Sequence, residues 1–151
     1  MKVKLKSKGM TLIEVIIVVA IIGIVIGMIL PNQLFYQHYR LKIYAKQLCN
    51  DIRYVRDWNM NYKESCALTL QTDGYSIIKN NRVYKKNPTS SLFVIAYDQK
   101  HSIIQFTMEG VPKMGGTTIT VSTKKKDYYM EITIVPASGR VFLKDEIQKI
   151  K

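Results

Sequence analysis

Residues 10–30 read MTLIEVIIVVAIIGIVIGMIL, and Thr11 and Glu14 are the only clearly polar side chains in this run. A helix rises about 1.5 Å per residue, so these residues extend about 31 Å, the thickness of the hydrocarbon core of a bilayer. We therefore predict a transmembrane helix over residues 10–30. A chain of 151 residues has room for this anchor and one further small domain.

Positive charge flanks only one end of the run. Lys2, Lys4, Lys6 and Lys8 precede it, whereas residues 31–39 contain no lysine or arginine. The positive-inside rule then keeps the N-terminus in the cytoplasm and sends the rest of the chain across the membrane. The predicted location is the cell membrane, with a single pass and an extracytoplasmic head.

Two ordinary explanations account poorly for the run. A secretory signal peptide has an apolar core of about 7–15 residues followed by small residues at the cleavage site, whereas this run is longer and is followed by Pro31 and Asn32. A plain signal anchor stays possible but does not explain Glu14, because a central charge in a membrane span costs about 2.5–3.5 kcal/mol on insertion scales. Glu14 therefore needs an explanation, and charged side chains inside membrane spans usually have a partner.

Residues 8–15, KGMTLIEV, resemble the class III signal of type IV prepilins and type II secretion pseudopilins. The resemblance implies that a prepilin peptidase cuts between Gly9 and Met10, which removes residues 1–9 as a leader, and that the new amine of Met10 is methylated. It also implies that Glu14 pairs with the ammonium group of a neighbouring subunit during filament assembly. Met10 departs from the pattern, since the family most often has phenylalanine there.

Beyond the apolar run, the pattern predicts an amphipathic second half of the same helix over residues 31–61. Pro31 removes a backbone donor, which predicts a kink or local melting of the helix. Positions on one face then recur at spacings of mostly three and four. They are Leu34, Leu41, Tyr44, Ala45, Leu48, Ile52, Val55 and Asn59. Both halves would form one helix of about fifty residues that ends near Asn61, about 75 Å long.

Residues 62–151 predict a β-rich globular head. Short runs of β-branched and aromatic residues alternate with glycine, proline and asparagine, and the Asp73-Gly74 pair is a strong hairpin signal. The predicted strands are 66–70, 75–78, 83–85, 92–97, 103–107, 117–122, 128–135 and 141–143. The expected fold class is α+β, with a long N-terminal helix packed on an antiparallel β-sandwich.

The head also resembles the GspH/FimT family of minor pseudopilins and minor pilins, and this narrows the first resemblance. Three features carry it: a helix pattern, a glycine turn before an alternating strand, and a late P-A-S-G-R-V segment. They are found at Ala45, Leu48 and residues 51–53, at residues 115–121, and at residues 136–141. The resemblance implies the pilin fold and a place in a filament.

Little in the head points to catalysis or to a bound metal. There is no G-x-S-x-G, H-E-x-x-H or phosphate-binding glycine loop, so we expect no enzymatic activity, no cofactor and no metal. His38 and His101 stand alone in the sequence. Cys49 and Cys66 match neither a CxxC pair nor a zinc framework, so they form either one disulfide or two small buried apolar residues.

Positive charge is the remaining clue to a ligand. The chain has 23 Lys+Arg and 11 Asp+Glu, a net charge of +12, and removal of the four leader lysines leaves about +8 (12 − 4). Lys124, Lys125 and Lys126 precede two tyrosines, a combination that suits a nucleic acid or merely a solvated hairpin tip. Some FimT-type pilins bind DNA through G-R-x-R, of which Gly139-Arg140 is the first half; Phe142 replaces the second arginine.

The two resemblances imply a minor pilin or pseudopilin that assembles into a filament of a type IV pilus, competence or type II secretion machine. The implied partners are a prepilin peptidase, other pilins, a membrane assembly platform and its ATPase. Two alternatives stay open. One is a DNA-binding subunit at a pilus tip that uses Lys124–Lys126 and Arg140, and the other is a membrane-tethered extracellular domain outside any filament.

Overall fold

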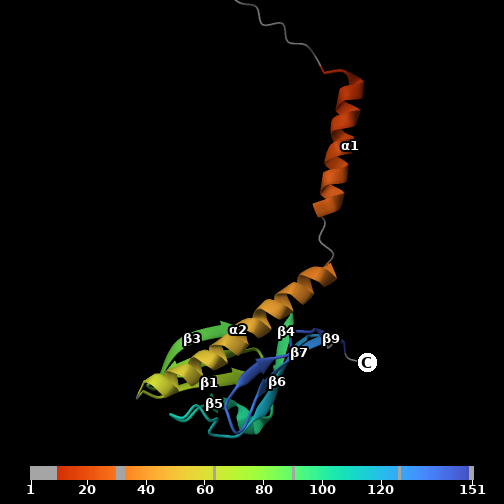
Figure 1. Ribbon diagram of the computed structural model, residues 1–151. Helices are drawn as coiled ribbons and strands as arrows, with labels where there is room; N and C mark the ends of the chain where they lie inside the picture. Colours follow the sequence, from red (N-terminus) through yellow and green to blue (C-terminus); the bar gives the residue numbers. More distant parts are fainter. Residues whose placement is uncertain (1–9, 30–32, 63, 90, 126, 150–151) are drawn as a thin grey trace, which may run out of the picture. The chain divides into compact units, whose positions relative to one another are not determined.

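The computed structural model describes residues 10–149 apart from residues 30–32, 63, 90 and 126. Its contacts divide the chain into two units, Met1–Phe35 and Tyr36–Lys151. The first unit contains helix α1, Leu12–Ile29 (Figure 1). Among the helices of the described residues, none combines the length and the apolar character that crossing a membrane requires. Gly9 and Pro31, with the predicted cut and kink, lie outside the described residues.

Helix α2, Gln33–Asn61, ends at the predicted residue. Its spacing of three and four places one row of side chains against the head. Leu41, Ala45, Leu48, Ile52 and Val55 on this row are completely buried. The amphipathic pattern therefore identified the face of α2 that packs on the strands, which confirms that prediction.

The first sheet has the strand order β3-β2-β1-β5, with every pair antiparallel. Its strands are β1 (Cys66–Gln71), β2 (Gly74–Lys79), β3 (Arg82–Pro88) and β5 (Ile103–Gln105). Gln71 pairs with Gly74 at the predicted hairpin. The turn between β2 and β3 consists of Asn80 and Asn81, with φ of 47° and 64°, a left-handed pair that asparagine tolerates well and that matches the twist of a hairpin.

The second sheet has the order β4-β6-β7-β8, and β9 also pairs with β7. Its strands are β4 (Phe93–Ala96), β6 (Thr117–Thr123), β7 (Tyr128–Ile134), β8 (Val141–Leu143) and β9 (Gln148–Lys149). A short 3-10 helix, η1 (Gln99–His101), precedes β5. The four strand pairings of this sheet among the described residues are all antiparallel, and the longest joins β6 to β7.

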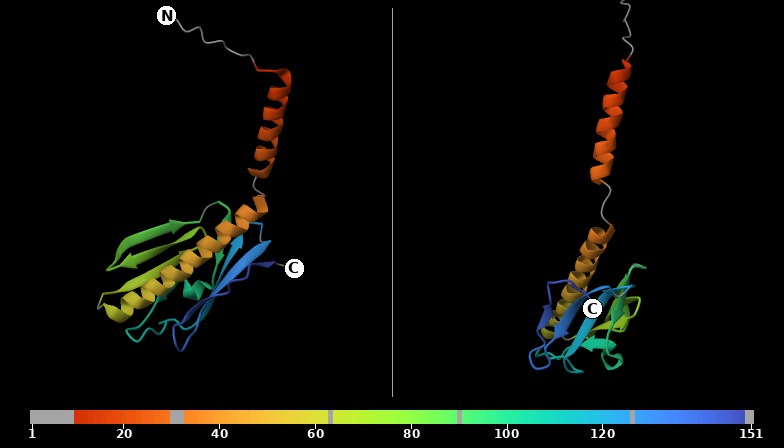
Figure 2. Two further views of the ribbon diagram at one scale, coloured as in Figure 1. Left: turned by 45° about the horizontal axis from the view of Figure 1, so that its top comes forward. Right: turned by 90° about the vertical axis from the view of Figure 1, so that its right-hand side faces the viewer.

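The two sheets and α2 share one apolar core. Figure 2 shows α2 running across the head alongside its strands. Alternate strand residues fill the space between them, such as Leu68 and Leu70 from β1 and Val121 and Ile132 from β6 and β7. The predicted α+β class, a helix packed on antiparallel sheets, is confirmed.

Candidate functional site

The first turn of α1 contains the only ionisable side chain of that helix, Glu14. The backbone N–H groups of Glu14 and Val15 donate to the carbonyl oxygen of Thr11 at 3.1 and 3.3 Å. Thr11 therefore occupies the capping position, and the Glu14 carboxylate lies in the first turn, where the helix dipole favours a negative charge. The sequence order Thr-x-x-Glu is also that of a capping box.

The residues that flank Glu14 along α1 are apolar and exposed. Met10, Leu12 and Ile13 are 68, 80 and 67% exposed, and the side chains from Val15 to Ile26 are exposed as well. A helix that is apolar on every face is stable only in apolar surroundings, which are lipid or other apolar helices. The exposed apolar faces of α1 therefore require apolar surroundings.

A second candidate site is a cleft of about 400 Å³ in the head. Its lining includes three arginines and one carboxylate. The lining residues are Arg53, Arg56, Asp57, Arg140, Val141 and Phe142. They come from α2 and from the segment that enters β8, so the fold joins residues more than eighty positions apart. We refer to this place as the arginine cleft.

Backbone carbonyl groups fix two of these guanidinium groups. Arg53 donates from Nε and Nη2 to the carbonyl oxygen of Val141 at 3.3 and 2.9 Å. Arg56 donates to the carbonyl oxygens of Gly110 at 3.1 Å and Ser138 at 3.3 Å. Because these acceptors are neutral, they orient the guanidinium groups without cancelling their positive charge.

A polar cluster anchors the first sheet to α2. The carboxylate of Asp51 accepts hydrogen bonds from Lys85 Nζ at 2.8 and 2.7 Å and from the Tyr75 hydroxyl at 2.6 Å. The Asn87 amide donates to both Asp51, at 3.2 Å, and Tyr75, at 2.6 Å. Burial and the hydrogen bond to Asp51 raise the pKa of Tyr75. With its charges and donors mutually satisfied, this cluster is structural.

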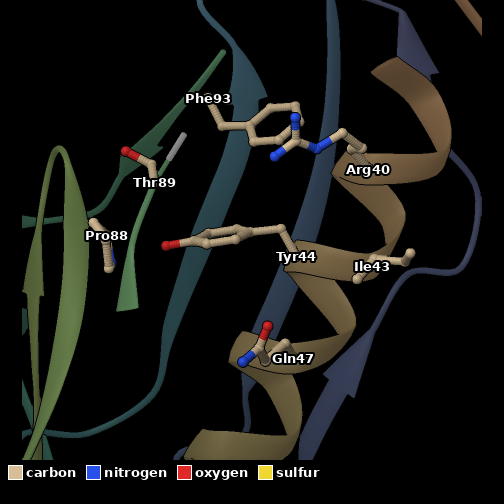
Figure 3. Close-up of a pocket in the computed structure, with 7 residues that line it drawn as sticks. All are labelled: Arg40, Ile43, Tyr44, Gln47, Pro88, Thr89 and Phe93. Atoms are coloured by element: carbon tan, nitrogen blue, oxygen red, sulfur yellow. The ribbon is translucent and has the colours of Figure 1, made fainter. Parts of the chain in front are cut away.

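Beside that cluster lies a shallow pocket of about 360 Å³. Figure 3 shows Arg40, Tyr44 and Gln47 projecting from successive turns of α2 toward Pro88 and Phe93. The Tyr44 hydroxyl donates to the carbonyl oxygen of Asn87 at 3.4 Å. Arg40 is the one charged residue that lines the pocket, and the lining contains no side-chain pair suited to catalysis. The pocket is therefore not a candidate catalytic site.

Comparison with known proteins shows what the N-terminal segment and the fold are similar to. Residues 4–30 match the family model of the prokaryotic N-terminal methylation motif. The fold resembles the type IV minor pilin FimU of Pseudomonas aeruginosa strain PAO1, with a TM-score of 0.61, 16% identity and coverage of 76% of this chain and 96% of FimU. The chain therefore combines an N-terminal methylation motif with a fold similar to that of a type IV minor pilin.

A second solved structure supports the same fold. It is the minor pseudopilin EpsH of the type 2 secretion system of Vibrio cholerae, with a TM-score of 0.56, 10% identity and coverage of 68% of this chain and 94% of EpsH. No curated protein sequence matches significantly. The predicted resemblance to pilins and pseudopilins is confirmed.

The residues predicted to bind DNA do not form one site. Lys124 and Lys125 are exposed in the turn between β6 and β7, and Lys126 lies outside the described residues. Arg140 follows the other end of β7, seven strand residues away, or about 23 Å at 3.3 Å per residue. The arginine cleft instead brings Arg140 to Arg53 and Arg56, which sequence patterns had not marked as a binding site.

The cysteines and histidines make their contacts within the head. Cys49 and Cys66 are both free and buried, the second of the two predicted alternatives, and burial raises the pKa of each thiol. His38 packs edge-on against Tyr128, with ring centroids 4.1 Å apart, and His101 Nε2 lies 2.9 Å from the carbonyl oxygen of Met114. Among the described residues, no three His, Cys, Asp or Glu side chains are grouped to hold a metal ion.

Proposed function

We propose that the protein is a minor pilin or pseudopilin, a structural subunit of a type IV pilus-like filament. Cleavage between Gly9 and Met10 removes the lysine leader, methylation modifies the amine of Met10, and the mature chain enters a filament through its apolar helix. The supporting comparisons are the methylation motif over residues 4–30 and the fold shared with a minor pilin and a minor pseudopilin.

The observation that carries this proposal is the position of Glu14 in α1. A single carboxylate lies in the first turn of an otherwise apolar helix, four residues after Met10. Cleavage places a cationic ammonium at Met10, and the attraction between opposite charges strengthens as the dielectric constant falls. An ammonium group of one subunit and Glu14 of the next can then neutralise each other inside an apolar helix bundle.

Before assembly the subunit is held in the membrane. This part of the proposal depends on the apolar sequence of residues 10–30, of which α1 covers Leu12–Ile29, and on the lysine-rich leader that keeps the N-terminus cytoplasmic. The partners are a prepilin peptidase, other pilins, a membrane platform and its ATPase. The protein has no enzymatic role in this scheme.

The proposal is tested by expressing the full chain in cells that contain a prepilin peptidase. Mass spectrometry of the N-terminal peptide and isolation of sheared filaments are the two measurements. We expect the wild-type peptide to begin at methylated Met10, Gly9→Val to keep its leader, and Glu14→Gln to mature normally but to be depleted from filaments. Glu146→Gln makes the same charge change on an exposed head residue and should assemble normally.

Each measurement has a result that opposes the proposal. A wild-type chain that keeps residues 1–9 in the presence of the peptidase identifies a tethered extracellular domain outside any filament. Normal incorporation of Glu14→Gln removes the role given to that carboxylate. A filament whose mass consists mainly of this chain makes it a major pilin rather than a minor one.

A further inference from the structure

The arginine cleft holds positive charge that the described residues leave unbalanced. Arg53, Arg56 and Arg140 line it, against a single carboxylate, that of Asp57. None of the ion pairs formed by the described residues includes any of these three arginines. Arg53 and Arg56 are also one helical turn apart on α2, where like charges repel. The cleft therefore favours an anion from outside the chain.

The guanidinium group of Arg56 is already oriented in the absence of a ligand. A guanidinium group has five N–H donors, and Arg56 uses two of them on the carbonyl oxygens of Gly110 and Ser138. The remaining donors have a fixed direction and no partner among the described residues. Fixing a side chain in advance lowers the entropy lost on binding.

Gly139 allows the backbone at Gly110 to approach closely. Its φ is +61°, and a Cβ at this position would collide with the carbonyl oxygen of Gly110, the same oxygen that holds Arg56. The next residue, Arg140, is exposed, and its side chain forms no hydrogen bond or ion pair with the described residues. A free guanidinium group thus stands beside two fixed ones.

An apolar surface adjoins these charges. Phe142 lines the cleft with its side chain 53% exposed, and Val141 lies beside it. Aromatic residues exposed next to arginine are typical of protein interfaces, where both types contribute strongly to binding. We propose that the arginine cleft binds an acidic segment of another filament subunit, in which an Asp or Glu carboxylate neighbours an apolar side chain.

The observations favour this partner over two others. A nucleic acid needs a continuous positive track, whereas Lys124 and Lys125 lie at the far end of β7 and the cleft itself measures about 400 Å³. A second copy of this chain is a poor match because its cations outnumber its acids by 23 to 11. The inference rests on the proposed function, since it names a neighbour within the same filament.

The test is a selection from a library of random peptides, using the full chain in neutral detergent micelles. The wild type is compared with Arg56→Gln, Arg140→Gln and Arg140→Glu, and with the control Lys100→Gln, which removes an exposed cation outside the cleft. A labelled single-stranded oligonucleotide is offered as competitor. A peptide recovered by the wild type is then measured against every variant.

We expect the wild type and Lys100→Gln to enrich peptides with Asp or Glu beside an apolar residue. Arg140→Gln should weaken binding of the recovered peptide about tenfold, the usual effect of losing one charge-assisted hydrogen bond. Arg140→Glu should abolish the acidic enrichment. Arg140→Lys, which keeps the charge but loses the planar fork, should recover part of the affinity.

Two results would overturn the inference. One is a set of selected peptides without acidic enrichment, or with the same enrichment in Arg140→Glu. The other is an oligonucleotide that displaces the peptides and loses affinity in the same arginine variants, which would make the cleft a nucleic-acid site. Neither result touches leader cleavage or the Glu14 dependence, so failure here is separable from failure of the proposed function.

Discussion

The side-chain amide of Asn59 forms hydrogen bonds with both backbone polar groups of Cys66. Its Nδ2 donates to the carbonyl oxygen of Cys66 at 2.7 Å, and its Oδ1 accepts from the backbone N–H of Cys66 at 3.3 Å. Nδ2 also donates to the carbonyl oxygen of Val55 in the preceding turn of α2 at 2.7 Å. One buried amide therefore ties the end of α2 to the first residue of β1.

Replacing Asn59 should destabilise the head. Asn59→Ala leaves buried donor and acceptor groups of Cys66 without a partner, so we expect the free energy of unfolding to fall by about 2 kcal/mol. Urea unfolding of the full chain in neutral detergent, followed by the fluorescence of Trp58, measures it. Asn61→Ala is the matched control, because Asn61 is exposed and bonds only within its own helix. Equal effects of the two substitutions would show that Asn59 does no more than any α2 asparagine.

The hydrogen bonds between Asn59 and Cys66 also bear on whether the two cysteines can form a disulfide. Cys49 lies ten residues before Asn59 on α2, or about 15 Å along the helix axis, while Cys66 is held against Asn59. Disulfide formation needs Cα atoms within about 7 Å. We expect two free thiols in the denatured protein purified without reductant, and none in Cys49→Ala/Cys66→Ala. A protein that loses its thiols on export and regains them only after reduction would contradict this arrangement.

Local patterns were enough to predict most of the elements. The apolar run with Glu14, the burial face of α2 and the hairpin at Asp73-Gly74 depend on neighbours a few residues apart, and the structure has them where the sequence placed them. Strand β9 and helix η1 are two and three residues long, too short to produce a pattern. Their existence depends on pairing and capping supplied by the rest of the fold.

The arginine cleft could not be predicted in this way. Arg53 and Arg56 read as the solvent face of an amphipathic helix, and Arg140 reads as part of a turn. Only the packing of α2 beside the segment before β8 brings them together, and no spacing along the chain encodes that contact. Lys124 and Lys125 are close to Arg140 in the sequence, which suggested a shared binding site. In the structure the length of β7 separates them, because they precede this strand and Arg140 follows it.

The Asp51 cluster should behave as one unit. Asp51→Asn removes the ion pair with Lys85 and weakens the bond to Tyr75, so we expect a loss of about 2 kcal/mol of unfolding free energy. Lys85→Met should cost less, and the double variant should lose less than the sum of the two single variants. Asp145→Asn is the control, since that carboxylate is exposed in its contacts with Lys42 and Lys46. Additive losses in the double variant would show that Asp51 and Lys85 act independently.

A comparison of Gly139 with Gly115 distinguishes the cost of a strained backbone from the cost of a steric collision. Both have positive φ, +61° and +84°, but a Cβ at Gly139 would strike the carbonyl oxygen of Gly110, whereas a Cβ at Gly115 would meet nothing within 4 Å. We expect Gly115→Ala to cost about 1 kcal/mol, and Gly139→Ala to cost more and to lower acidic-peptide binding as well. Urea unfolding and the peptide assay measure the two effects. Equal losses of unfolding free energy in both variants would mean that the backbone at Gly110 moves aside at no cost.

Alkaline pH should weaken the contact between α2 and the first sheet through Tyr44. Burial, followed by the negative charges of Asp51 and Asp73, raises the pKa of Tyr44 from 10.0 to about 12. The folded state therefore keeps the phenolic proton over a range in which the unfolded chain has lost it. Its contribution to stability is complete below pH 10 and declines as the pH rises toward 12. Urea unfolding at intervals across this range should show the decline.

Tyr44→Phe isolates that contribution from the other groups that titrate at high pH. The variant has no phenol to ionise in either state, so its stability should fall less steeply than the wild type between pH 10 and 12. At neutral pH it loses only the 3.4 Å hydrogen bond to the Asn87 carbonyl, a small cost because the bond is long. Tyr39→Phe, at an exposed position on the same helix, should keep the wild-type slope. Identical slopes in all three proteins would mean that Tyr44 ionises as easily in the folded head as in the unfolded chain, and that the negative charge of Asp51 does not reach it.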